Sequence, residues 1–301
     1  MHAKSRLLGC IALAGLAMLS GTARASQPAN ELVFATGSVA HITLSYDEES
    51  ITFFDSADGN LLIREYMTQN QAGYHARVEQ SADSIKISEG GKPLFKGDFS
   101  RYVEVYWPAS YRGALTVSTT DGNIDLSRPS LSLDSLRIDS TSGTVVLGQA
   151  QARTIHLSST RGSLALGTLR ADTIRIETTS GTVCCEDVCG NVIYTGTSGD
   201  AEFRSAEGSG SYTASNSGTL SVAYTEVTGD LSFFNKNGSI RVTLPSDLSF
   251  SFAAAVKNGS LSTTFQDCLT LHDKTVSGDV GEHPAVAVHA ETRNGSIEVN
   301  R

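Results

Sequence analysis

Five charged side chains at regular spacing are the first candidates for chemistry in this 301-residue sequence. They are Arg137, Asp139, His156, Arg175 and Glu177, related by steps of two and nineteen residues. Residues two apart project from the same face of a β-strand. On neighbouring strands the five would form an outward ladder of opposite charges. Such a ladder is either a solvated face, where each ion pair contributes little, or a strip that faces a carbohydrate.

Two of these residues also allow an enzymatic reading. Asp139 and Glu177 would lie two strands apart, about 9–10 Å by strand spacing, which is the upper limit for the carboxylates of an inverting glycosidase. The other histidines are scattered, and the sequence has no Ser-His-Asp order, phosphate loop or H-E-x-x-H motif. We therefore predict no catalytic residue, no cofactor and no metal site, with a carbohydrate-active β-helix enzyme as the alternative.

The cysteines offer a second chemistry. Cys185 falls in an apolar column and is expected to be buried. Cys184 should point outward, and Cys189 should lie just past the strand at the next turn. A disulfide between Cys184 and Cys189 would clip that turn in an oxidising compartment, with unbonded thiols as the alternative. The C-C-x3-C spacing does not suit zinc.

These residues sit within a repeat that decides the fold. Short words such as TSGTV, KNGSI and RNGSI recur, each with a glycine, at steps of 17 to 21 residues. The ten glycines are Gly122, Gly143, Gly162, Gly181, Gly199, Gly218, Gly238, Gly259, Gly278 and Gly295. Such a period is typical of a solenoid of stacked units.

Columns of apolar residues flank these glycines. Two residues after each glycine all ten positions are apolar, beginning with Ile124, Val145, Leu164 and Val183. Alternation with polar residues indicates strands that bury one face. We predict an all-β fold in which residues 113–301 form a β-solenoid of two-strand rungs of about nineteen residues. An extended β-meander is the alternative, because Asn-Gly also favours hairpins.

The N-terminal part differs from the repeat. Lys4 and Arg6 precede an apolar run and a small-x-small site ending at Ala25, which is typical of a cleaved signal peptide over residues 1–25. A lipobox that ends at Cys10 is the alternative. In residues 26–112, apolar and polar residues alternate without a clear repeat period. This segment is expected to form an irregular β cap or the first rungs. No second segment is apolar enough to cross a bilayer.

The net charge of the chain limits the classes of partner that we expect. Losing residues 1–25 removes three of the 23 basic residues and leaves 20 against 32 acidic ones, a net charge of −12. An acidic surface disfavours phosphate backbones and anionic lipids, so nucleic acid is not an expected partner. We expect an exported chain, in the periplasm, at the cell surface or outside the cell.

The run YVEVYWPASYRGALTVSTTDGNIDL, the TSGTV words, IRVTLPSDLSFSFAAAVKNGSL and the closing RNGSIEV resemble the bacterial putative-adhesin family of β-strand repeats. The resemblance covers most of residues 30–301. It implies a β-solenoid of unknown function outside the cytoplasm, with no catalytic residues to carry over. The predicted function is a non-enzymatic, adhesin-like binding or scaffold protein of the cell envelope, with an envelope protein or a glycan as partner. End-to-end self-assembly through an open final strand, Ile297–Val299, is a further alternative.

Overall fold

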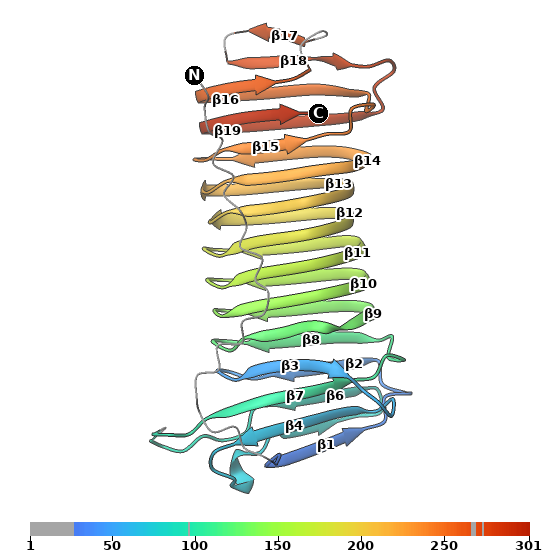
Figure 1. The fold of residues 1–301 in the computed structure, drawn as a ribbon, viewed down its shortest axis with the longest axis vertical. Coiled ribbons are helices and arrows are strands. Elements are labelled where there is room, and N and C mark those ends of the chain that lie inside the picture. The colour runs from blue at the N-terminus through green and yellow to red at the C-terminus, as the bar shows by residue number, and fades with distance from the viewer. Residues whose placement is uncertain (1–26, 96, 266–268, 273) are drawn as a thin grey trace, which may run out of the picture.

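The computed structural model describes residues 27–301 except 96, 266–268 and 273. Its centre is a stack of six long strands, each following one coil of the chain and pairing in parallel with the next (Figure 1). They are β9 (Ile124–Ser140), β10 (Thr144–Ser159), β11 (Ser163–Thr178), β12 (Thr182–Ser198), β13 (Ala201–Ser217) and β14 (Leu220–Asn235). This confirms the β-solenoid, because a meander would pair consecutive strands antiparallel. The predicted signal peptide and Cys268 lie outside the described residues.

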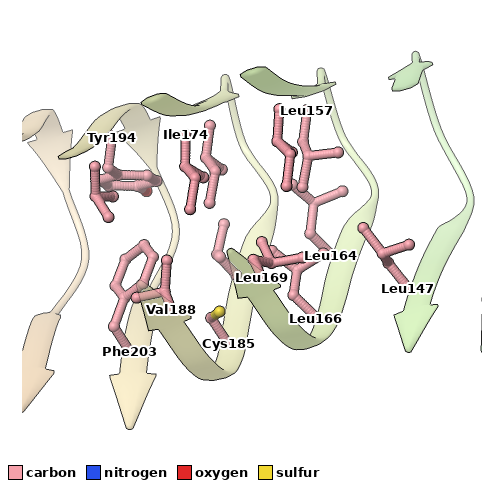
Figure 2. Close-up of a cluster of buried hydrophobic side chains, with 14 of the residues drawn as sticks. Leu147, Leu157, Leu164, Leu166, Leu169, Ile174, Cys185, Val188, Tyr194 and Phe203 are labelled. Carbon is pink, nitrogen blue, oxygen red and sulfur yellow. The ribbon is translucent and has the colours of Figure 1, made fainter. Parts of the chain in front are cut away.

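The predicted apolar columns form the core of the stack. Ile124, Val145, Leu164 and Val183 are register neighbours on successive coils, and none is more than 2% exposed. Figure 2 shows the same arrangement for side chains that meet inside neighbouring coils. Each coil therefore buries its apolar face against the next, which a single coil could not do alone.

Each coil has three short straight segments, which we call walls. The sequence had predicted rungs of only two strands. In β10 the buried apolar residues come in pairs at 145/147, 150/152 and 155/157. The alternation shifts phase between pairs, and the chain must bend there to keep its buried side inward. The middle wall is built from Ala150 and Ala152 in β10 and from Leu131 and Leu133 in β9.

The repeat glycines stack directly on one another at one corner of the coil. A Cβ atom on Gly162 would lie 2.0 Å from the carbonyl oxygen of Gly143, closer than Cβ atoms pack. The stack runs in the order Gly122, Gly143, Gly162, Gly181, Gly199, Gly218, Gly238, Gly295 and Gly259. Gly278, predicted as a member, lies instead in an antiparallel pair opposite Phe252. Close backbone approach thus explains why this column is glycine.

A buried polar side chain three residues before the glycine supports many of these corners. The Thr119 hydroxyl accepts a hydrogen bond from the backbone N–H of Gly122 at 3.0 Å, and Ser159 does the same for Gly162 at 3.1 Å. Asn235 Nδ2 donates to the carbonyl of Gly218 at 2.9 Å. These side chains therefore satisfy backbone groups that the tight corner leaves without a strand partner.

The N-terminal residues continue the stack, but out of chain order. Its elements are β1 (Asn30–Phe34), β2 (His41–Ser45), β3 (Ser50–Asp55), β4 (Leu61–Met67), the 3₁₀ helix η1 (Ala72–Tyr74), β5 (Arg77–Gln80), β6 (Ser84–Ser88), β7 (Arg101–Trp107) and β8 (Ala114–Thr119). β2 lies between β6 and β8, and β3 lies between β7 and β9. The outermost strands, β1, β4 and β5, pair antiparallel, which ends the parallel stack.

The C-terminal end is also threaded out of order. Its strands are β15 (Ile240–Thr243), β16 (Phe250–Thr263), β17 (Leu269–His272), β18 (Thr275–Val280) and β19 (Val286–Asn300). The final strand β19 is inserted between β15 and β16, so that Ile297 pairs with Ile240 on one side and Leu261 on the other. The prediction that Ile297–Val299 forms an open edge is therefore wrong. The antiparallel β17–β18 hairpin covers part of β16 instead.

Candidate functional site

The five predicted ladder residues form one hydrogen-bonded chain across three coils. Arg137 Nε donates to Asp139 at 2.6 Å, and Arg137 Nη1 donates to His156 Nδ1 at 2.7 Å. Because arginine only donates, Nδ1 accepts and Nε2 carries the proton, which it shares with Glu177 at 3.2 Å. Arg175 Nε completes the chain by donating to Glu177 at 2.7 Å. The ladder geometry thus agrees with the nineteen-residue register.

This arrangement does not favour acid catalysis by the ladder carboxylates. Hydrogen bonding from Arg175, opposed by burial and supported by His156, holds the pKa of Glu177 below its usual range. A glycosidase acid needs a pKa raised towards neutrality. Asp139 is held by two nitrogens of Arg137. Both carboxylates are therefore set up as ion-pair partners.

Arg175→Gln should raise the midpoint at which Glu177 titrates. The lowered pKa means that Glu177 contributes stability above its unfolded-state pKa and loses it as pH falls through its folded-state pKa. Carboxyl carbon NMR through an acid titration measures this midpoint. The effect of Arg175→Gln on the free energy of unfolding should be small, because the Glu177 side chain is 35% exposed. An unchanged midpoint in Arg175→Gln would contradict the assignment.

A hydroxyl-lined groove of about 460 Å³ lies beside the ladder, at the N-terminal side of the stack. Its floor includes one row of side chains that are register neighbours on five strands. In spatial order the row is Ser88, Ser45, Ser118, Asp139 and Ser158. Four of the five are serines, shorter than the Arg137 and His156 side chains of the ladder. Small side chains in register therefore leave a trough that crosses the coils.

The groove walls are also polar. One side carries Thr120, Thr141 and Thr160 from the glycine corners, and the N-terminal end carries Tyr46, Asp47 and Glu89. The hydroxyls of Ser118 and Ser45 lie 3.1 Å apart and bond to each other. Of the groove residues, Asp139 alone was among the predicted site residues. The recurrence of serine four residues before the glycine, at Ser118 and Ser158, was the available signal.

A buried charge cluster lies next to this end of the groove. Arg101 is fully buried, and its Nη2 contacts Glu49 at 3.0 Å and also reaches Glu89. Lys92 Nζ contacts Glu89 at 2.6 Å and Glu49 at 3.6 Å. The backbone N–H of Asp47, a groove residue, donates to Glu89 at 2.6 Å. The cluster therefore holds the β2–β3 corner that forms the groove's N-terminal end.

The cysteines differ from the prediction in one respect. Cys185 is buried as expected and lies inside the coil near Leu169, Val188 and Phe203 (Figure 2). Cys184 and Cys189 carry thiols, so the disulfide proposed between them is not present. The two residues lie on either side of the bend between Cys185 and Val188, where the buried alternation of β12 shifts phase.

Cys185 should resist alkylation in the folded protein. Burial raises the pKa of its thiol to about 12, and the thiolate is the reactive form. Treatment with iodoacetamide at pH 8, followed by peptide mass spectrometry, should label Cys185 only after denaturation. Partly exposed Cys184 serves as the internal reference. Labelling of both at the same rate would mean that the coil opens readily at this rung.

Two absences hold for the residues that the structure describes. Within the described part of the chain, no group of three or more His, Cys, Asp or Glu side chains is placed to hold a metal ion. The same residues contain no helix with the length and hydrophobicity needed to cross a membrane.

The coils, stacked glycines and polar faces define a β-solenoid with antiparallel strands at its ends. The chain belongs to the toastrack DUF4097 family, whose model matches residues 39–300. No curated protein matches it significantly.

Several solved structures are similar to this chain at low sequence identity. A protein named as a putative lipid binding protein, from Parabacteroides distasonis, is 13% identical with a TM-score of 0.50, over 91% of this chain and 97% of that one. A protein named as a putative adhesin from the same species is 14% identical with a TM-score of 0.43, over 90% and 96%. Another, from Bacteroides fragilis, is 15% identical with a TM-score of 0.37, over 90% and 96%.

Proposed function

We propose that this protein is a non-enzymatic binding module of the cell envelope that holds a carbohydrate chain in the hydroxyl-lined groove. The supporting observation is the row Ser88, Ser45, Ser118, Asp139 and Ser158, which brings one polar side chain from each coil into a continuous trough. The signal-like residues 1–25 support export, so the ligand would be an envelope or extracellular glycan.

The spacing between the side chains of the row suits an extended carbohydrate chain. Successive coils are about 4.8 Å apart, close to the length of one sugar ring in an extended chain. Serine and threonine hydroxyls both donate and accept, as sugar hydroxyls do. The groove therefore offers one polar contact for each ring over several rings.

The rigid frame supports binding without turnover. The floor residues are on paired strands, which hold them in fixed positions, and the one carboxylate in the row, that of Asp139, is already bonded by Arg137. The low pKa of Glu177 supplies no proton donor at neutral pH. Of the predicted carboxylate pair, Glu177 therefore lacks the protonation state that an acid catalyst needs.

Filling the groove should abolish this binding. We expect Ser118→Trp to weaken the affinity for a bound polysaccharide at least about tenfold, because the indole would occupy the trough. Calorimetric titration against purified envelope polysaccharides provides the measurement. Ser132→Trp is the matched control, since Ser132 is exposed on β9 outside the groove.

Two results would contradict the proposal. One is equal affinity in the Ser118→Trp and Ser132→Trp variants, which would place the ligand elsewhere. The other is release of new reducing ends from a bound polysaccharide by the unaltered protein, which would favour the enzyme.

A further inference from the structure

The loop between β6 and β7 exposes two large apolar side chains. Leu94 is 93% exposed and Phe95 is 86% exposed. Among the described residues, the other exposed large hydrophobic side chains are Val33 at 56% and Val78 at 38%. Single exposed apolar residues are common, but an adjacent leucine and phenylalanine with almost no cover indicate an interaction site.

The first stem of this loop is packed tightly. Gly90 and Gly91 lie against η1, where the N–H of Gly91 donates to the carbonyl of Gly73 at 2.9 Å. A Cβ atom on Gly90 would meet the carbonyl oxygen of His75 at 2.1 Å. Glycine at these positions lets the chain pass directly over the helix.

The second stem is held against the same helix. The ring of Phe99 packs edge-on against Tyr74, with centroids 5.5 Å apart. Nη1 of Arg101 donates to the carbonyl of Tyr74 at 2.6 Å. Lys92 and Arg101 tie both stems to Glu49 and Glu89 through the charge cluster. The base of the loop is thus fixed, while its tip reaches out from the side of the solenoid (Figure 1).

We propose that Leu94 and Phe95 insert into the surface of a lipid bilayer and dock this end of the solenoid on it. Two side chains offer far less area than the roughly 1,200–2,000 Å² of a stable protein interface. A convex tip also needs a matching pocket in a protein partner, whereas a bilayer accepts any convex apolar shape. Area and shape together therefore favour lipid.

The charges around the tip specify the kind of bilayer. The Lys92 ammonium lies within 4 Å of carboxylates of Asp47, Glu48, Glu49 and Glu89, so it is neutralised locally. In the sequence, Lys96 and Asp98 follow Phe95 with opposite charges, and the chain as a whole is acidic. Docking should therefore depend on apolar insertion, and anionic headgroups should not strengthen it. This inference is independent of the groove and its ligand.

Vesicle flotation tests the docking. The exported chain should float with phosphatidylcholine vesicles, and adding phosphatidylserine should not increase the bound fraction. Leu94→Ser with Phe95→Ser should reduce the partition coefficient about a hundredfold, because each buried apolar side chain contributes about tenfold or more. Val33→Ser with Val78→Ser is the control and should leave flotation unchanged.

A second readout reports insertion directly. The protein has one tryptophan, Trp107, which is 1% exposed and should not respond to vesicles. In Phe95→Trp, the added indole should show a blue shift on vesicle addition, and Val33→Trp should show none. The proposal is overturned if the chain does not bind phosphatidylcholine vesicles or if binding requires anionic lipid. It is also overturned if the indole emission of Phe95→Trp is unchanged while the vesicles are bound.

Discussion

Replacing Gly218 with alanine is expected to destabilise the protein by about 2–5 kcal/mol, combining backbone strain with overpacking. Gly218 has a φ of +121°, which a residue with a Cβ atom rarely adopts, and the added Cβ would lie 2.0 Å from the carbonyl oxygen of Gly199. Backbone atoms on the neighbouring coil cannot move aside as a side chain can. Urea unfolding followed by circular dichroism measures the loss.

Gly37→Ala provides the matched control for this prediction. Nothing lies within 4 Å of a Cβ atom at Gly37, and its φ is outside the left-handed region. The same substitution there should change the free energy of unfolding by less than about 1 kcal/mol. The direction of this change depends on the conformational entropy of the unfolded chain. Equal losses at the two positions would mean that the glycine stack does not limit the spacing of the coils.

The glycine stack also explains why the centre of the fold was predictable from sequence. Each coil places the same backbone atoms beneath the next, so the same side chain is excluded at every step, and the column of Gly143, Gly162 and Gly181 becomes a visible period. The inward alternation of Val145 and Leu147 repeats for the same reason. The charge ladder follows from this register.

The two ends could not be predicted in the same way, because strand order there depends on contacts between distant segments. Gly295 stacks on Gly238, and Gly259 stacks on Gly295. The three asparagine-glycine words that contain these residues are nearly identical in sequence, so the pattern contains no signal that β19 precedes β16 in space. The middle wall was missed for another reason. Its inward residues are often small, such as Ala150 and Ala152, and their alternation is weak.

The groove could not be predicted for two reasons: some of its strands join the row out of chain order, and its serines do not stand out in the sequence. Ser118 and Ser158 follow the repeat, but Ser45 and Ser88 come from strands that join the row out of chain order. Serine is also common on the outer faces of all the coils. Only the spatial order of β6, β2, β8, β9 and β10 shows that these hydroxyls line one trough.

Replacing Arg101 with methionine is expected to cost about 3–5 kcal/mol at neutral pH, the range for breaking a buried ion pair by removing one partner. The Arg101 side chain is fully buried and contacts both Glu49 and Glu89. Methionine fills much of the same volume, so the loss should come mainly from carboxylates left in a buried site with Lys92 as their nearest cation. The free energy of unfolding from urea titration at pH 7 measures it.

The pH dependence separates this charge effect from a packing effect. Burial raises the pKa of Glu89. Burial also acts to raise the pKa of Glu49. The hydrogen bond from Glu89 and the Arg101 and Lys92 cations outweigh that effect, so the pKa of Glu49 is lowered. Without Arg101, both folded-state pKa values should rise, so the cost of Arg101→Met should shrink as pH falls and the carboxylates take up protons. Adding Glu89→Gln should recover part of the loss at pH 7, since it removes one uncompensated charge. A cost that is the same at pH 4 and pH 7, and that Glu89→Gln leaves unchanged, would assign Arg101 a packing role alone.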